Sequence, residues 1–156
     1  MSRDTLVDQV MTAEPLTFGI DDRVEDAMRA LAERGLSGAP VVGRDGKLAG
    51  LLSDDDFLVA ESRLHVPTVL SILGAYIEWP PAQRHFEHEL RKAVGSRVGE
   101  VMTSDPVACT RADSVERVAT LMHEHHVDRL PVVDEQRRVV GIITRTDLVR
   151  AMVSDG

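Results

Sequence analysis

Cysteine and aromatic residues are scarce in this chain of 156 residues, which contains one cysteine, one tryptophan and one tyrosine. Cys109 alone cannot form a disulfide bond within the chain, and no set of cysteines and histidines has the spacing of a zinc site. A lone thiol is typical of a reducing compartment, so the sequence predicts a cytoplasmic protein.

Runs of positive charge and long apolar stretches are also missing. The net charge is −8. Since proteins bind nucleic acid mainly through Lys and Arg contacts to phosphates, no nucleic-acid partner is expected, although one local basic pocket is compatible with this balance. The longest apolar-rich stretch, residues 66–79, is too short and too interrupted to cross a bilayer, so no membrane association is expected either.

No catalytic motif is recognisable. The sequence has no nucleophile elbow, no Walker-type glycine loop and no pair of carboxylates in a catalytic setting. We therefore predict no catalytic residues and no cofactor, and we expect a binding protein rather than an enzyme.

What the sequence does contain is an internal repeat. When the chain is shifted by 91 residues, residues 7–59 align with residues 98–150 without a gap, and 14 of the 53 pairs are identical. A repeat that occurs only twice indicates a two-lobed pseudosymmetric module rather than a solenoid. Because each half alone would bury too little surface to be stable, the halves are expected to pack against each other.

Each copy has the same expected order of strand, helix, strand, strand and helix, which predicts an α/β fold. The first helices are expected to start at sequences typical of capping boxes, Asp22–Glu25 and Asp113–Glu116. The last helix of the second copy is expected to bury Leu148 and Met152. Apolar runs predict the paired strands at residues 39–42, 48–52, 130–133 and 139–143.

The repeat divides the chain into three parts. We predict a first copy at residues 1–61, a helical insert at 62–96 and a second copy at 97–156. The insert has an apolar stripe that includes Tyr76 and Trp79. Because exposed apolar stripes and these two residue types mark interfaces, the insert is also a candidate interaction surface.

Both copies end in the motif Gly–apolar–apolar–Ser/Thr–x–x–Asp, at Gly50–Asp56 and Gly141–Asp147. The simplest interpretation is a helix start, in which the hydroxyl and the carboxylate cap backbone amides. A second interpretation adds ligand binding, because a helix N-terminus can bind phosphate and a carboxylate can accept hydrogen bonds from both ribose hydroxyls. The motif alone leaves both interpretations open.

The complete pattern resembles the cystathionine-β-synthase (CBS) domain family. The common features are Val-Met-Thr at the start of each copy, the proline after it, the runs Ala39–Val42 and Leu130–Val133, and the two Gly-to-Asp endings. The resemblance implies a tandem CBS pair, or Bateman module, of two β-α-β-β-α repeats. In such a pair a pseudo-twofold axis relates two clefts that bind adenine nucleotides.

Carried over onto the second copy, the resemblance implies that Asp147 holds ribose and that Arg129 lies beside phosphate. Thr144, Thr146 and Arg145 would approach the phosphate. Val107, Leu130 and Pro131 would contact adenine. The implied residues of this second cleft are Val107, Arg129, Leu130, Pro131, Thr144, Arg145, Thr146 and Asp147.

The implied first cleft departs from this pattern. Gly38 replaces Arg129, and Asp54 and Asp55 replace Arg145 and Thr146. Three carboxylates at one helix start would repel a polyphosphate, so we predict weaker binding here, or a ligand with little phosphate. The implied residues of the first cleft are Thr17, Ala39, Pro40, Ser53 and Asp56.

Two alternatives to a nucleotide sensor stay open. The module could be a ligand-free interaction scaffold, which the acidic first cleft favours. It could also bind metal through His123, His125 and His126, although their spacing is not that of a His-Glu-x-x-His motif. The resemblance further implies a homodimer and a separate downstream protein that receives the signal.

Overall fold

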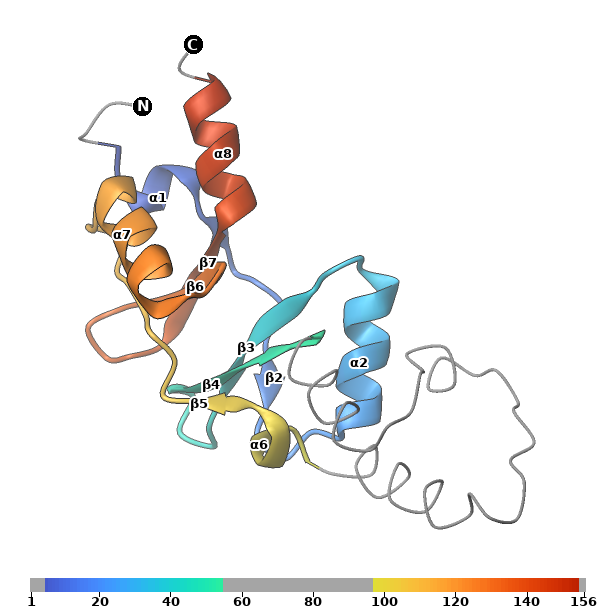
Figure 1. Cartoon of the computed structure of the whole chain (residues 1–156). Coiled ribbons are helices and arrows are strands. Elements are labelled where there is room, and N and C mark those ends of the chain that lie inside the picture. Colours follow the sequence, from blue (N-terminus) through green and yellow to red (C-terminus); the bar gives the residue numbers. More distant parts are fainter. Residues whose placement is uncertain (1–4, 55–96, 155–156) are drawn as a thin grey trace, which may run out of the picture.

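The computed structural model describes residues 5–54 and 97–154 (Figure 1). Asp55, Asp56, the rest of the last helix expected in the first copy and the expected insert lie outside the described residues. Within the described part, two small sheets lie next to each other, and α2 and α7 each cover one face of a sheet.

From α2 and α7 onward the described elements follow the predicted order, but each copy begins with a short helix and a short strand that were not predicted, and the segment after Pro106 forms only an isolated bridge at Cys109. The first copy provides α1 (Val7–Val10), β1 (Thr12–Ala13), β2 (Phe18–Gly19), α2 (Val24–Glu33), β3 (Gly38–Val42) and β4 (Leu48–Ser53). The second copy provides α6 (Val98–Val101), β5 (Thr103–Ser104), α7 (Val115–His125), β6 (Arg129–Val133), β7 (Val139–Thr144) and α8 (Arg145–Ser154). None of the helices in this described part is long and apolar enough to cross a membrane.

The starts of α2 and α7 differ from the predicted capping boxes. The carboxylate of Asp22 accepts a hydrogen bond from the amide of Gly19 (2.8 Å), and that of Asp113 accepts one from the amide of Thr110 (2.8 Å). Both aspartates close the turn before the helix, and the cap of α7 is the next residue, Ser114. The prediction was wrong because a short carboxylate can satisfy amides of a turn as well as those of a helix start.

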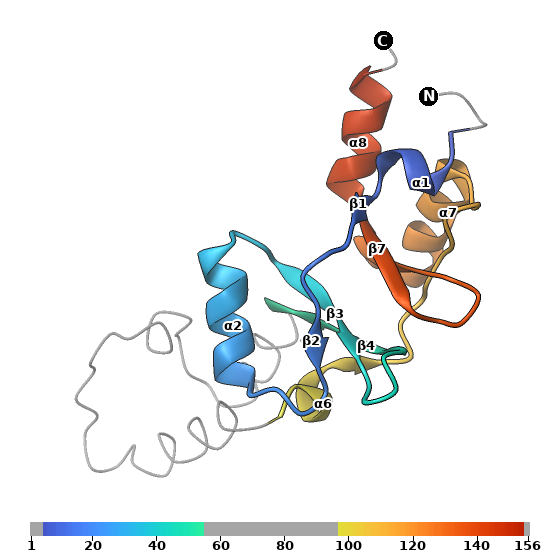
Figure 2. The same ribbon diagram turned by 180° about the vertical axis from the view of Figure 1, so that it is seen from behind.

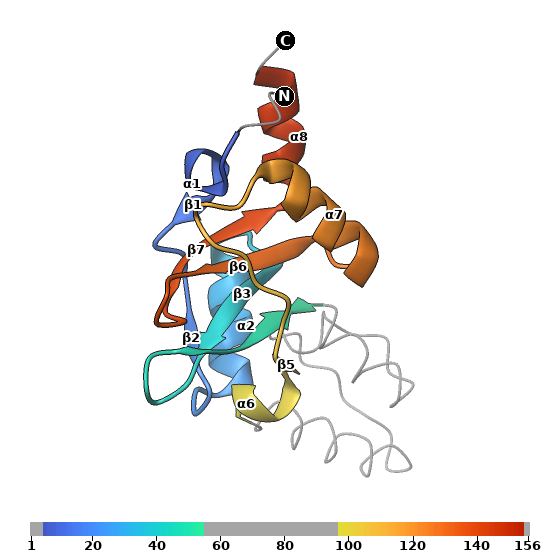
Figure 3. The same cartoon turned by 90° about the vertical axis from the view of Figure 1, so that its left-hand side faces the viewer.

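The two copies exchange their leading segments. The first sheet has the strand order β2-β3-β4-β5, in which β5 belongs to the second copy. The second sheet has the order β1-β7-β6, in which β1 belongs to the first copy. Figure 2 shows the N-terminal segment passing from β1 in one sheet to β2 in the other, and Figure 3 shows the matching path of the chain from β5 to α7.

The exchange joins the two hydrophobic cores. Val7 of α1 is fully buried in the core formed with α7, β6, β7 and α8, and Val98 of α6 is fully buried in the core formed with α2, β3 and β4. Full burial of an aliphatic side chain of this size stabilises a fold by roughly 1.5–3 kcal/mol. Neither copy therefore has a complete core without the first residues of the other.

Backbone details repeat with the offset of the sequence repeat. The amide of Val7 donates to the carbonyl of Asp113 (2.9 Å), and the amide of Val98 donates to the carbonyl of Asp22 (2.8 Å). A pseudo-twofold axis thus relates the two copies. Left-handed backbone conformations also occur in matched pairs, namely Glu14 with Asp105, Gly35 with His126, and Gly46 with Arg137.

Two matched glycines permit the close approach of the exchanged strands. A Cβ atom on Gly50 in β4 would lie 2.7 Å from the carbonyl oxygen of Thr103, and one on Gly141 in β7 would lie 3.1 Å from that of Thr12. Glycine in a strand interior often marks such a contact with another backbone. The close approach of the exchanged strands therefore explains why both copies have glycine at this position of the repeat.

The last helix, α8, differs from the prediction at Met152. Leu148 is buried as expected, whereas 56% of Met152 is exposed. The reason is that the C-terminal end of α8 extends beyond α1 and α7 (Figure 1). Val149 and Val153 are exposed as well and lie on the same side of the helix by their spacing.

We predict that Gly50→Ala lowers the free energy of unfolding by about 1–3 kcal/mol, because its methyl group forces the backbone of β5 away from β4. The matched control is Gly141→Ala, whose methyl group meets the exchanged backbone at 3.1 Å rather than 2.7 Å and should cost less. Denaturant unfolding followed by circular dichroism measures both. A Gly50→Ala variant as stable as the wild type would contradict the packing of the exchanged strand.

Candidate functional site

The Thr144–Asp147 motif forms the helix start that its spacing predicts. The amide of Thr144 donates to the carboxylate of Asp147 (2.9 Å), and the amide of Asp147 donates to the hydroxyl of Thr144 (3.2 Å). This reciprocal capping orders the first turn of α8. In the first copy Ser53 ends β4, and its motif partner Asp56 lies outside the described residues.

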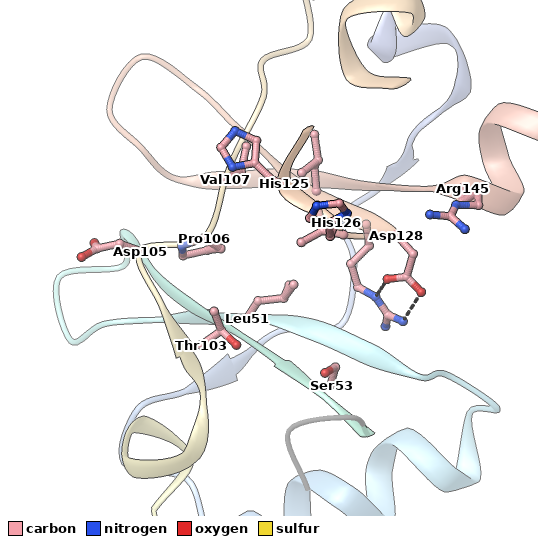
Figure 4. Close-up of a pocket in the computed structure, with 13 residues that line it drawn as sticks. Leu51, Ser53, Thr103, Asp105, Pro106, Val107, His125, His126, Asp128 and Arg145 are labelled. Atoms are coloured by element: carbon pink, nitrogen blue, oxygen red, sulfur yellow. Dashed lines mark hydrogen bonds and ion pairs between the residues drawn. The ribbon is translucent and has the colours of Figure 1, made fainter. Parts of the chain in front are cut away.

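A cleft of about 420 Å³, which we call cleft A, is lined by both copies. Figure 4 shows that β4, the segment after β5 and the end of α7 contribute its walls. The lining residues are Leu51, Ser53, Thr103, Asp105, Pro106, Val107, His125, His126, Val127, Asp128, Arg129, Leu130 and Arg145.

The exchange of leading segments builds cleft A. In the antiparallel pair of β4 and β5, Leu51 lies opposite Thr103. The chain that leaves β5 therefore passes along the first sheet, and Pro106 and Val107 enter the lining beside Leu51. The same chain returns through α7 and places Leu130, at the start of β6, in the lining as well.

Cleft A groups the predicted residues differently from the sequence-based assignment. Val107, Leu130 and Arg145 line it together, as implied, but the hydroxyl beside them belongs to Ser53 of the first copy. Asp147 lies instead in a separate hollow with residues of α1 and α8. The reason is that β5 pairs with β4 and not with β7, so the segment after β5 meets the motif of the other copy.

The predicted prolines do not line this cleft. Pro131 and Pro40 are both fully buried within their strands, and Ala39 is 1% exposed. Neighbouring side chains of a strand point to opposite faces, so Leu130 and Pro131 cannot both face cleft A. Thr17, in the segment before β2, is exposed.

A second hollow of about 380 Å³, which we call cleft B, shares three residues with cleft A. It brings together Thr144 and Thr146, which the resemblance assigns to phosphate, with Ser37 of the first copy. Its lining residues are Ser37, Asp128, Arg129, Thr144, Arg145, Thr146 and Val149.

Arg129 lies at the junction of the two clefts. It is the only buried charged residue in residues 5–54 and 97–154, with 8% of its side chain exposed. Its guanidinium donates to the carboxylate of Asp128 at 3.0 and 3.4 Å (Figure 4), and these hydrogen bonds lower the pKa of Asp128. Because Arg145 also lines both clefts, two cations and one anion meet here, which favours a bound anion.

Sequence reasoning missed several residues of the clefts. Asp128 directly precedes the predicted Arg129, and Ser37 lies two residues before the predicted Ala39, so their position near predicted residues was the available signal. The apolar residues Leu51, Val127 and Val149 carried no comparable signal, and the sequence singled out His125 and His126 only as candidate metal ligands. The missed residues are Ser37, Leu51, Thr103, Asp105, Pro106, His125, His126, Val127, Asp128 and Val149.

The histidine cluster is divided in the structure. His125 and His126 line cleft A, whereas His123 is not among the lining residues. In the described part of the chain, no three His, Cys, Asp or Glu side chains are arranged to hold a metal ion. This arrangement gives no support to the metal-binding alternative.

Both copies match a known family. The family described as CBS domain matches residues 7–63 and residues 98–154. The chain belongs to the CBS domain family. Each match covers one copy of the repeat, and residues of both CBS domains line cleft A and cleft B.

Relatives of this CBS protein are found in distant organisms. It is 29% identical to the uncharacterized protein MJ1426 of Methanocaldococcus jannaschii, over 90% of this chain and 87% of that protein. It is 34% identical to the chloroplastic CBS domain-containing protein CBSX1 of Arabidopsis thaliana, over 82% of this chain and 55% of that protein. The match thus spans about half the length of CBSX1.

Solved structures of CBS pairs share this fold. The structure of CBSX2 in complex with AMP has a TM-score of 0.73 and 27% identity, covering 97% of this chain and 98% of that one. Protein MJ1225 of Methanocaldococcus jannaschii has a TM-score of 0.76 and 25% identity, covering 97% of this chain and 49% of that one.

Cys109 takes no part in the clefts. It is 2% exposed, and burial raises the pKa of its thiol to about 12, helped by the nearby charge of Asp113. Since the thiolate is the reactive form, a thiol with this pKa is inert at neutral pH.

We predict that Cys109 does not react with a disulfide reagent such as dithionitrobenzoate in the folded protein at a pH of about 8, and reacts at once in denaturant. The folded state also keeps a proton that the unfolded chain releases, so the free energy of unfolding should fall as the pH rises above 9.0 towards about 12. Absorbance of the released thiolate reports the first effect. Rapid labelling of folded protein would contradict the burial.

Proposed function

We propose that this protein is a regulatory module that binds an adenine nucleotide in the clefts between its two CBS repeats. The observation that carries the proposal is cleft A, in which apolar residues, a hydroxyl and arginines converge from both copies. The solved complex of the relative CBSX2 with AMP supports the class of ligand. A ligand held where two repeats meet can favour one of their arrangements, and a separate downstream protein would read that arrangement.

The lining of cleft A suits the three parts of a nucleotide. Val107 and Leu130 offer apolar contact to adenine, and Ser53 offers a hydroxyl to ribose or phosphate. The exposed side chain of Arg145 can meet the phosphate with charge-assisted hydrogen bonds. Such a site favours a monophosphate or a longer phosphate chain over free adenosine.

The motif aspartates would hold ribose. The amide of Thr144 uses one carboxylate oxygen of Asp147, so a ribose hydroxyl would be held by the other oxygen. Asp147 lines the separate hollow beside α1 and is hydrogen-bonded to Thr144 of cleft B, so we propose that it holds the ribose of a nucleotide whose phosphate lies in cleft B. For Asp56, which lies outside the described residues, the proposed role in holding ribose rests on the sequence motif alone.

We predict that Arg145→Ala weakens AMP binding by roughly tenfold or more, because a hydrogen bond to a charged group is lost, while adenosine binding changes little. The matched control is Arg117→Ala, which removes the same charge from the exposed face of α7, outside both clefts and outside the hollow that contains Asp147. Isothermal titration calorimetry of wild type and variants with AMP and adenosine gives the constants.

The outcomes separate the candidate functions. No binding of AMP or adenosine by the wild type would favour the ligand-free scaffold. Equal losses in Arg145→Ala and Arg117→Ala would show a general charge effect and would remove the phosphate assignment. Steady hydrolysis of ATP by the purified protein would overturn the proposal that the module is not an enzyme.

We also propose that the protein forms a homodimer through α8. Val149, Met152 and Val153 are exposed by 53%, 56% and 74% and form an apolar strip on this helix. Contiguous apolar strips of this kind mark interaction sites. Tyr76 and Trp79, the other candidates for the interface, lie outside the described residues.

Light scattering should therefore give about twice the mass of one 17.1 kDa chain. The double variant Met152→Glu and Val153→Glu should shift the mass towards one chain, because charge at an apolar interface is costly. Ser154→Glu is the control, since it adds charge to the same helix end outside the apolar strip. A monomeric wild type would disprove the dimer, and a dimeric double variant would disprove the role of α8.

A further inference from the structure

The repeat places glycine and arginine at matched positions, Gly38 and Arg129. The structure brings these two counterparts into contact: a Cβ atom on Gly38 would collide with Nη1 of Arg129 and would lie 3.1 Å from its Cζ. The guanidinium thus lies over the backbone of its own counterpart, next to the pseudo-twofold axis. A Cβ atom on Gly38 would also lie 2.8 Å from the backbone carbonyl oxygen of Leu52, so position 38 has no room for a side chain as it stands. The pair of repeats therefore has one buried guanidinium where its symmetry would call for two.

This single guanidinium borders both clefts. Arg129 lines cleft A and cleft B, and Asp128 holds it in place from one side. Arg145 also lines both clefts, so neither cleft has an arginine of its own in its lining. By contrast, Val107 lines only cleft A and Thr146 lines only cleft B. The two clefts therefore have separate walls and a common cationic boundary.

We propose that the two clefts compete for Arg129, so that a phosphate bound in one cleft weakens the binding of a phosphate in the other. This inference rests on the proposed function and adds a regulatory property to it. The buried guanidinium has few alternative positions, since Gly38 supports it on one face and Asp128 on its edge. A ligand without phosphate has no use for the guanidinium, and two such ligands would bind independently.

The coupling follows from a binding cycle with one cleft blocked at a time. Val107→Trp fills cleft A, and Thr146→Trp fills cleft B. Calorimetry with AMP gives one dissociation constant for each blocked variant and two stepwise constants for the wild type. By linkage, the product of the two wild-type constants equals the product of the single-cleft constants only when the clefts are independent.

For AMP we expect the wild-type product to exceed the single-cleft product by about tenfold, the loss expected for one charge-assisted contact. For adenosine we expect the two products to agree. In an Arg129→Met background the excess for AMP should disappear, because the buried shared guanidinium is gone. An excess that persists there but is lost in an Arg145→Ala background would assign the competition to Arg145, which also lines both clefts, and would overturn the role of Arg129. Direct repulsion between two phosphates would instead keep or enlarge the excess in that background, and this result would overturn the role of Arg129.

Equal products for AMP in the wild-type background would overturn the competition itself. That cycle needs no change at Arg129, so it decides the matter even if Arg129→Met fails to fold. If Val107→Trp fails to fold, Thr103→Trp replaces it, since Thr103 is exposed and lines only cleft A. A wild type that binds neither ligand would refute the proposed function, an outcome distinct from two independent sites.

Discussion

The exchange of leading segments is the constraint on which the rest of this structure depends. Val7 completes the core of the second copy and Val98 that of the first, so each copy supplies a buried side chain that the other lacks. Strand pairing fixes the same arrangement, because β1 and β5 each extend the sheet of the opposite copy. Covalent connections and buried side chains together therefore set the relative position of the two sheets. The same contacts fix the positions of the residues that line the clefts between the sheets.

The sequence was sufficient to predict α2, α7, α8 and the paired strands β3, β4, β6 and β7, because each depends on local information. Apolar runs and spacings are read within a few residues, and these helices and strands follow them closely. The short exchanged elements α1, β1, α6 and β5 were not predicted. The aspartates before α2 and α7 show where local information ends. Asp22 and Asp113 have the spacing of a capping box, yet they bind amides of the preceding turn. Both uses satisfy the same carboxylate, and the choice depends on backbone geometry that the sequence does not specify.

The site was predictable in its residue types but not in its grouping. Val107, Leu130 and Arg145 share a cleft as expected, while the nearest motif hydroxyl is Ser53 rather than Thr144. Two similar repeats make this ambiguity unavoidable. The apolar segment of each copy could lie against the Gly-to-Asp motif of its own copy or against that of the other copy. Only the strand pairing of β4 with β5 removes the ambiguity, and that pairing joins residues about fifty positions apart with no distinct sequence signal.

Pseudosymmetry also explains where the two copies must differ. Counterparts that lie far from the axis can stay alike, as Gly50 and Gly141 do, because each has its own surroundings. Counterparts that meet can also stay alike where only their backbones pair, as Lys47 and Arg138 do. Gly38 differs because a side chain there would meet the guanidinium of Arg129 and the carbonyl oxygen of Leu52. Packing thus explains why position 38 has no side chain. Since the asymmetric pair borders both clefts, the same steric conflict that breaks the symmetry also gives the clefts a single buried cation in common.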